Sequence, residues 1–342
     1  MTRERLYGKV LDELTAVTAE ASLPPYTARQ IAGWLYKRGA PEISAMTDLS
    51  LKARTLLEAH YETGLTPPSS EALSTDGTKK YLFRLDDNRF IETAYIPDRD
   101  RATVCLSVQS GCRMGCRFCM TARQGFQGNL TAGEILNQFR SLPEHDSLTN
   151  IVYMGMGEPL DNLEEVLRSL EILTSEWGYG WSPTRITVST VGITGKIKEY
   201  LERTRCHLAV SLHTPFDEER LAMMPVQNAH PVREIIDVIR AFDFGRQRRV
   251  SFEYIVFKGL NDTPAHVKEL ARLLNGIRCR INLIRFHSIP GSEYSSPGPK
   301  EMEAFRDSLN ARGMTATIRA SRGEDISAAC GLLSTLEQNK NI

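Results

Sequence analysis

From residue 103 onward the chain alternates short apolar runs with longer amphipathic stretches, and this alternation restricts the fold more than any other feature. A short apolar run is typical of a buried strand, whereas apolar residues recurring every three or four positions are typical of a helix. Strands that alternate with helices favour parallel pairing through right-handed crossovers. We therefore predict an α/β fold, with strands near residues 103–108, 150–154, 185–189, 207–211, 250–256 and 280–285, and helices near 131–142, 161–176, 193–204, 231–243, 263–275 and 299–312.

Six such units are too few to close an eight-stranded barrel, so we expect an open, partial (β/α)6 barrel. The region before it has a different character. Residues 1–66 have apolar side chains at helical spacing and predict a small helical N-terminal domain. Residues 67–100 begin with a proline-rich linker and continue as a hairpin that turns at Asp86, Asp87 and Asn88. The barrel and its C-terminal segment then occupy residues 101–342.

The composition restricts the class of protein and its location. With 342 residues, of which 41% are hydrophobic and 25% charged, the chain is large enough for a barrel and one small appended domain. The polar N-terminus and the lack of a long apolar run predict no signal peptide, no membrane span and a cytoplasmic location.

The charges are unevenly distributed although they sum to zero. Residues 246–322 contain 14 Lys and Arg against 7 Asp and Glu, which makes this stretch +7. Such an excess is expected of one basic, nucleic-acid-binding face, and equally of an ordinary solvated surface. On the first interpretation, the candidates for phosphate contacts are Arg246, Arg248, Arg249, Lys37 and Arg38.

Three cysteines form a CxxxCxxC motif directly after the first expected strand: Cys112, Cys116 and Cys119. A structural zinc site needs four protein ligands. Three thiolates on a four-iron cluster instead leave one iron open, which the amino and carboxylate groups of S-adenosylmethionine (SAM) can chelate. The alternative is a structural zinc site whose fourth ligand is distant in sequence. The spacing favours the iron–sulfur cluster, because no fourth ligand lies nearby.

Other polar residues also follow the ends of expected strands, where barrel enzymes carry their reactive groups. Gly157 allows close approach of a ligand to the backbone, and the Glu158 carboxylate is suited to the ammonium group of methionine. Ser189, Ser211 and His213 are suited to the ribose or carboxylate of the same ligand. Each of these residues alone is more often an ordinary turn residue.

The run from Cys105 to Phe126, with Gly-Met-Gly-Glu-Pro-Leu at 155–160 and Ala-Ala-Cys-Gly around Cys330, resembles the RlmN/Cfr family of radical-SAM RNA methyltransferases. The resemblance covers nearly the whole chain and is nearer to the RlmN branch. It implies a [4Fe-4S] cluster on the cysteine triplet and two SAM molecules per turnover. The implied SAM contacts are Gly157, Glu158, Ser189, Ser211, Leu212, His213 and His287. His287 departs from the family pattern, because the family commonly has Pro-Trp-Asn at residues 285–287.

The resemblance also implies a reaction, methylation of C2 of an adenosine in the peptidyl-transferase centre of 23S rRNA and of one beside the tRNA anticodon. Cys330 would carry a methyl group that is activated as a radical and added to the base. Cys105 would release the product by forming a disulfide with Cys330, and Glu92 would accept the proton. Without the family, Glu92 would be expected to be a solvent-facing strand carboxylate.

The resemblance implies a flavodoxin- or ferredoxin-type reductase as a further partner. Two alternatives stay open: methylation at C8, as in the Cfr branch, and a non-enzymatic RNA-binding protein with a structural metal site.

Overall fold

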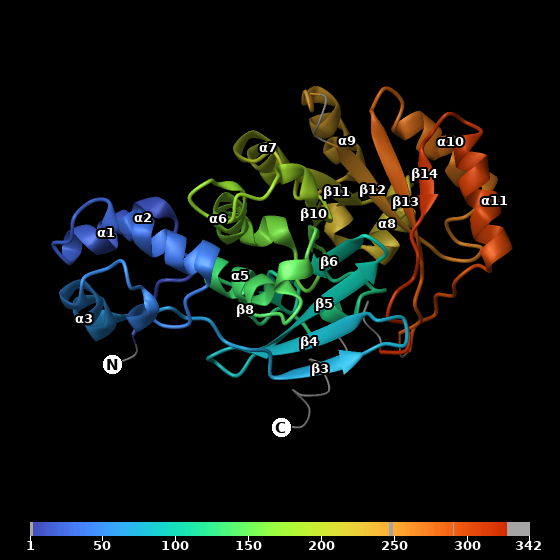
Figure 1. Cartoon of the computed structure of the whole chain (residues 1–342). Coiled ribbons are helices and arrows are strands. Elements are labelled where there is room, and N and C mark those ends of the chain that lie inside the picture. The colour runs from blue at the N-terminus through green and yellow to red at the C-terminus, as the bar shows by residue number, and fades with distance from the viewer. Residues whose placement is uncertain (1–2, 246–248, 290, 327–342) are drawn as a thin grey trace.

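The centre of the fold is a ten-stranded sheet with the order β14-β13-β12-β11-β10-β9-β6-β5-β4-β3 (Figure 1). The computed structural model describes residues 3–245, 249–289 and 291–326. Within these ranges, neighbouring strands from β6 to β14 are parallel. These strands are β6 (Arg101–Cys105), β9 (Asn150–Tyr153), β10 (Ile186–Thr190), β11 (His207–Ser211), β12 (Val250–Val256), β13 (Cys279–Arg285) and β14 (Ala316–Ile318).

The predicted α/β partial barrel is confirmed, with one addition. All six expected strands are present with shifts of a few residues at their ends, and β14 is a further short parallel strand. The sheet keeps two edges, β3 and β14, so the barrel is open.

The expected helices are also present and lie on the outer side of the parallel strands (Figure 1). They are α5 (Ala132–Arg140), α6 (Leu163–Thr174), α7 (Thr194–Arg203), α9 (Val232–Ala241), α10 (Pro264–Leu273) and α11 (Pro299–Asn310). Each is amphipathic and directs its apolar face to the strands, as in α9, where Ile235, Ile236 and Ile239 are buried. Short helices α4 (Met120–Arg123) and α8 (Asp217–Met223), and the strand pair β7 (Gln109–Ser110) and β8 (Gly128–Asn129), belong to the connecting loops.

An antiparallel extension continues the sheet beyond β6. It consists of β3 (Ser70–Leu73), β4 (Lys79–Arg84) and β5 (Phe90–Asp98), and β5 pairs with β6. The predicted hairpin corresponds to β4 and β5, and its turn residue Asn88 has a φ of 64°. Strand β3 was not predicted. Because β5 joins the hairpin to the barrel strand that precedes the cysteine loop, hairpin side chains can reach the same face as barrel side chains.

The N-terminal region is helical, as expected, and packs beside α5 and α6 (Figure 1). It contains α1 (Leu11–Glu20), α2 (Thr27–Ala32), a π-helix (Gly33–Arg38) and α3 (Leu51–His60), with short strands β1 (Glu4–Arg5) and β2 (Tyr61–Glu62). The Tyr36 ring lies 5.9 Å from Trp177 and 5.7 Å from Tyr179. These aromatic contacts connect the helices to the barrel core.

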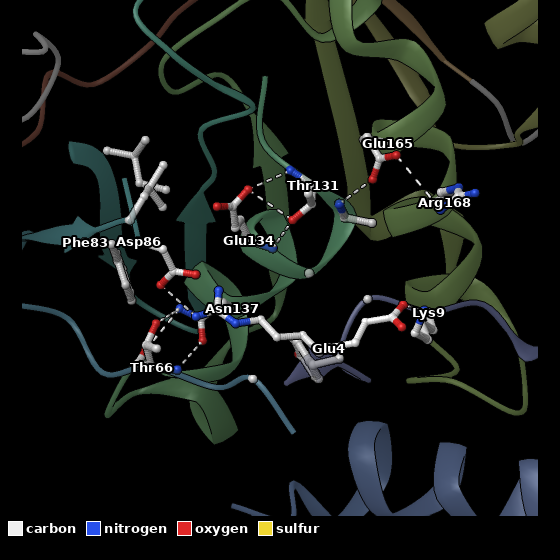
Figure 2. A pocket seen from close by; sticks show the side chains of 18 of the residues that line it. Glu4, Lys9, Thr66, Phe83, Asp86, Thr131, Glu134, Asn137, Glu165 and Arg168 are labelled. Carbon is white, nitrogen blue, oxygen red and sulfur yellow. Dashed lines mark hydrogen bonds and ion pairs between the residues drawn. The ribbon is translucent and has the colours of Figure 1, made fainter. Parts of the chain in front are cut away.

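A cavity of about 400 Å³ lies between this helical region, the hairpin and helices α5 and α6 (Figure 2). Ion pairs bridge it: Arg168 contacts Glu13 at 2.8 Å, and Arg5 contacts Asp86 at 2.8 Å. Charged side chains of both signs therefore link the N-terminal region to α6 and to the hairpin. No helix among the described residues is long and apolar enough to cross a membrane.

Candidate active site

The concave face of the sheet contains a cavity of about 540 Å³. Its walls come from the hairpin, from barrel strands β6, β9, β10 and β13, and from the segment after β14. Four residues that the sequence singled out line it: Glu92, Cys105, Cys119 and His287. The fold thus brings together residues far apart in the sequence, because Glu92 and His287 are 195 positions apart.

Strand register explains why the hairpin contributes to this cavity. Ala94 of β5 is paired with Lys80 of β4 on one side and with Cys105 of β6 on the other. Paired residues on neighbouring strands share a face, and so do residues two apart on one strand. Glu92 therefore lies on the same face as Lys80 and Cys105.

The strand pattern alone predicts that Glu92 faces solvent, and this prediction is wrong. Its side chain is only 6% exposed, and Oε2 lies 2.5 Å from Nζ of Lys80, which is 1% exposed. The reason is that β5 is an internal strand of the sheet and not a free hairpin edge. Sequence reasoning missed Lys80, because a lysine in a hairpin strand is ordinarily a surface residue.

Cys105 is the last residue of β6 and points into the cavity. Burial raises the pKa of its thiol to about 11, although a backbone hydrogen bond at Met154 and the charge of Arg319 act in the opposite direction. The thiol therefore keeps its proton at neutral pH and must lose it to become a nucleophile.

The cysteine triplet lies in the loop between β6 and α4. Backbone hydrogen bonds hold this loop: Cys112 N–H donates to Gly125 O, and Arg117 N–H donates to Met223 O. Burial raises the pKa of Cys112 to about 12, and burial with the neighbouring thiols raises the pKa of Cys116 further. Closely spaced thiols whose ionisation is disfavoured, as for Cys112 and Cys116, fit a strongly cationic group, which stabilises thiolates.

The described residues contain no group of three His, Cys, Asp or Glu side chains gathered to hold a single metal ion. Thiolates that hold a four-iron cluster bind different irons. The donor set of the loop, three closely spaced thiols, fits the cluster.

A second cavity of about 220 Å³ lies at the carboxyl ends of β9 to β12. It adjoins the first, because Met154, Gly155 and Ile284 line both. Five of the seven residues expected to contact SAM line this second cavity: Gly157, Glu158, Ser189, Ser211 and His213. Leu212 is fully buried and does not line it.

Glu158 is held rigidly at the floor of this cavity. Its carboxylate accepts hydrogen bonds from the Thr190 hydroxyl at 2.6 Å, from Val191 N–H at 2.8 Å and from Leu160 N–H at 2.9 Å. Burial nevertheless raises its pKa to about 7. A carboxylate has about four acceptor positions, so one is left for a cationic ligand, and a bound ammonium group would supply the counter-charge that the site lacks.

His213 and Gly157 shape the rest of the cavity. Burial lowers the pKa of His213 to about 3, so its ring is neutral, and Nδ1 accepts a hydrogen bond from Ile255 N–H at 3.0 Å. The Nε2 atom therefore carries the proton and is a donor. Gly157 has a φ of +96°, and a Cβ there would lie 2.5 Å from Gln109 Cβ, so this turn requires glycine.

His287 lies in the larger cavity and not beside the other expected SAM contacts. Its Nε2 is 3.0 Å from Ser321 Oγ and 3.3 Å from Glu324 Oε1. In this structure it therefore holds the segment that follows β14. The same segment is fixed by Asp325, which accepts hydrogen bonds from Ser74 and Thr75. Cys330 lies outside the described residues, four positions after Ile326.

The sequence reasoning also missed the basic residues around the larger cavity. Five arginines line it: Arg101, Arg185, Arg285, Arg319 and Arg322. Of the five residues expected to contact phosphates, Arg246 and Arg248 lie outside the described residues, and Arg249, Lys37 and Arg38 do not line this cavity. Glu253, also missed, lines the smaller cavity and lies 3.6 Å from Arg319 Nε.

A partial barrel with a cysteine triplet after its first strand, next to a cavity suited to SAM, defines a radical-SAM enzyme. Comparison with known proteins agrees: residues 106–274 match the Radical SAM superfamily. The structure also resembles the crystal structure of a radical SAM methyltransferase from Sphaerobacter thermophilus, with a TM-score of 0.89, 42% identity and coverage of 96% of this chain and 98% of that one.

The remaining comparisons identify the particular family. Residues 5–63 match the ribosomal RNA large subunit methyltransferase N-terminal domain. The "Probable dual-specificity RNA methyltransferase RlmN" of Parabacteroides distasonis is 58% identical over 97% of each chain, and that of Bacteroides fragilis is 54% identical over 100% of each. The chain belongs to the RlmN family. Its cofactors are accordingly a [4Fe-4S] cluster and SAM.

Proposed function

We propose that this enzyme methylates C2 of an adenosine in the peptidyl-transferase centre of 23S rRNA, and of an adenosine next to the tRNA anticodon. The observation that supports this most is the shared face of β5 and β6. A buried carboxylate, Glu92, and a thiol, Cys105, line one cavity with Cys119 of the cluster loop. A carboxylate and a thiol are two of the groups that the proposed methyl transfer requires; the third, Cys330, lies outside the described residues.

The chemistry of the base explains why such groups are needed. Adenine C2 is electron-poor, and its C–H is not acidic, so it does not attack a methyl donor as a nucleophile. When bound, the cluster and SAM supply the radical that makes the substitution possible. The protein's part is to carry the carbon, to accept the C2 proton and to release the product.

Cys330 is the proposed methyl carrier, and the structure supports its reach into the cavity. The chain is held by His287 at Ser321 and Glu324, and residues 321 and 322 line the cavity. Cys330 follows the last cavity-lining residue, Arg322, by eight positions in the sequence.

Glu92 and Cys105 are the proposed groups for the closing steps. After the carbon radical on Cys330 has added to C2, the adduct has to lose one electron, which passes to the bound cluster, and the C2 proton, which Glu92 takes. The Cys105 thiol then gives up its proton and its sulfur attacks the Cys330 sulfur. The sulfur–carbon bond breaks, the released carbon takes up a proton to become the methyl group, the methylated base leaves and a disulfide forms. The disulfide must be reduced by an external thiol before the next turnover.

The RNA substrate has to deliver one unstacked base into the cavity. The five arginines around the cavity are suited to the flanking phosphates. A flavodoxin- or ferredoxin-type reductase is the proposed electron source, and the proposed location is the cytoplasm.

Incubation of the anaerobically purified protein with deproteinised 23S rRNA, SAM and a reductant tests the reaction. Nucleoside analysis should then show 2-methyladenosine. Formation of 8-methyladenosine would instead assign the Cfr-type reaction. A colourless protein with one zinc and no methylation, in place of a brown one that absorbs near roughly 400 nm, would overturn the proposal.

The roles of the two cysteines are tested by a trapping experiment. Cys105→Ala should purify from cells with RNA that survives denaturation, because the thioether forms but is not resolved. Cys105→Ala/Cys330→Ala should carry none, because no thioether can form. If Cys105→Ala contains no RNA and still turns over, the two-cysteine mechanism is wrong for this chain.

A further inference from the structure

The cluster loop, which carries Cys112, Cys116 and Cys119, also lines another hollow that has no role in the proposed reaction. This hollow has a volume of about 410 Å³ and is lined by Cys116, the flanking residues Gly115 and Arg117, the helix α4 residues Ala122 and Arg123, and residues 291–294. It shares no lining residue with either cavity of the active site. Cys119 lines the substrate cavity and Cys116 lines this hollow, so the loop presents two of its thiols to two different spaces.

Because the hollow is separate from both cavities, its role must differ from binding SAM or the base. SAM and the base are assigned to the cavities lined by Glu158 and Cys105, and the hollow includes neither residue. What must still reach the cluster from outside is an electron. Electron-transfer rates fall steeply with distance, so a donor is most effective where little protein separates it from a ligand of the cluster. Cys119 is more exposed than Cys116 but lines the cavity assigned to the base. Cys116 is buried, with 8% of its surface exposed, and its exposed neighbour Gly115 has no side chain to add to the distance from the hollow.

The charge around the hollow indicates the kind of donor. Residues 111–127 contain three arginines and no aspartate or glutamate. Arg117 and Arg123 are exposed at the hollow, and the one acidic residue in its lining is Glu293. Arg113, also exposed, stacks 3.9 Å from the Phe126 ring centroid and pairs with Asp161 at 2.8 Å. The rim is therefore basic, and complementary charge favours rapid association with an acidic partner.

We propose that the surface formed by Gly115, Arg117, Arg123 and Tyr294 is the docking site of an acidic one-electron carrier protein of the flavodoxin type. The proposal rests on the function proposed above, because only a radical-SAM reaction needs this electron. On docking, the carrier is oxidised by one electron and the cluster is reduced by one electron. No atom is transferred, and the substrate cavity stays free for RNA.

The anchoring of the loop suits a fixed docking surface. Arg117 N–H donates to Met223 O at 3.0 Å, which ties the loop to helix α8. The next residue, Phe118, packs inward, with its ring 5.0 Å from His213 and 5.6 Å from Phe257. The backbone at Arg117 is thereby held, and its exposed side chain is directed away from the SAM cavity.

A reductant exchange tests the site in the loaded enzyme. We expect Arg117→Glu/Arg123→Glu to lose at least about tenfold in methylation rate with reduced bacterial flavodoxin, because the reversed charges repel an acidic protein. With dithionite, a small reductant that needs no docking surface, its rate should stay within about twofold of the unmodified protein. The matched control is Arg278→Glu/Arg312→Glu, two exposed arginines outside the cluster loop and the hollow, which should behave as the unmodified protein with both reductants.

Binding provides a readout that does not depend on activity. Calorimetry with oxidised flavodoxin should show an affinity that falls as salt rises, and Arg117→Glu/Arg123→Glu should abolish the binding. Equal losses of rate with both reductants, or unchanged flavodoxin binding, would overturn the proposal. So would a fall in RNA affinity in the same variant, since the hollow would then be an RNA surface. If dithionite supports no methylation in the unmodified protein, the proposed function is wrong. The binding of flavodoxin to the unmodified protein and to the variant then still tests whether this surface is the docking site.

Discussion

Lys80 Nζ lies 2.5 Å from Glu92 Oε2 on adjacent strands of the sheet, and the two side chains are 1% and 6% exposed. Each of these buried charges has the other as its partner, and breaking such a pair leaves an uncompensated buried charge. Lys80 is therefore suited to fix the position of the Glu92 carboxylate, the proposed acceptor of the C2 proton, at the wall of the cavity.

Replacing Lys80 by Met should stall the enzyme after the base has been attached. We expect Lys80→Met to accumulate covalent protein–RNA although Cys105 is intact, and its methylation rate to fall by on the order of 10²-fold, the low end for loss of a general base. Denaturing gels after a single turnover, together with the methylation rate, measure both effects.

Two further variants distinguish this role from a structural one. Lys80→Arg keeps the charge and should retain most of the activity. Glu92→Gln should stall at the same stage as Lys80→Met. If Lys80→Met is folded, as judged by thermal melting, yet forms no adduct at all, the lysine acts before the proton transfer and the assignment is wrong.

Loss of any one cysteine of the triplet should remove the cluster. Cys116→Ala leaves two thiolates for a group that requires three protein ligands, so iron per protein should fall and methyl transfer should cease. Iron analysis and the visible absorption spectrum measure the first effect directly. Cys206→Ala, at a buried cysteine outside the loop, is the matched control and should keep its iron. Full iron and activity in Cys116→Ala would refute the cluster assignment.

SAM binding should depend on the protonation of Glu158. Burial raises its pKa to about 7, so the free protein takes up a proton there as the pH falls below about 7. A ligand that binds through its amino group needs the carboxylate ionised, and binding must then release that proton. SAM affinity should consequently rise as the pH is raised from 6 to 8, that is, from about one unit below this pKa to about one unit above it.

Calorimetry in buffers with different ionisation enthalpies measures the proton release directly. Glu158→Gln cannot ionise, so its SAM affinity should be lower and should lack this component of the pH dependence. If the variant and the unmodified protein release the same number of protons, Glu158 does not contact the ligand's amino group.

The arginines around the cavity should dominate the salt dependence of RNA binding. Each phosphate contact to single-stranded RNA contributes about 0.7 to the slope of log affinity against log salt. Arg101→Gln/Arg185→Gln removes two such contacts and should therefore flatten the slope by about 1.4. Arg249→Gln, at a residue away from the cavity lining, should leave it nearly unchanged. The opposite pattern would place the phosphate contacts at Arg249 and not at these two cavity arginines.

The parts of this fold that the sequence predicts are those with a local signal. The strand–helix alternation gives all six expected strands, because each strand is an apolar run between helices with one apolar face. Strand β14, with three residues, is too short to produce such a signal, and β3 is exposed over most of its length. The cysteine triplet and the Gly-Met-Gly-Glu turn are likewise local, so their positions at strand ends were predictable.

Side-chain relationships across strands were not predictable in this way. Whether Lys80 contacts Glu92 or solvent depends on which strand pairs with the other edge of β5. The hairpin sequence does not contain that information. The arginines around the cavity come from β6, from the 3-10 helix (Pro183–Arg185) before β10, from β13 and from the segment after β14, so they form no run in the sequence. His287 follows the last predicted strand, but its contacts depend on the path of residues 321–324.

The close contact between Gly8 and Gly133 joins the N-terminal region to helix α5. Gly8 has a φ of +97°, and a Cβ there would lie 2.3 Å from Gly133 N, a backbone atom that cannot turn away. Gly8→Ala should therefore combine backbone strain with a steric clash and lower the free energy of unfolding by about 2–4 kcal/mol. Gly276→Ala is the matched control, since Gly276 has a φ of +80° and no atom within 4 Å of the added Cβ. It should show the strain alone, about 1 kcal/mol. Urea unfolding measures both, and equal losses in the two variants would show that the Gly8–Gly133 approach does not resist a methyl group.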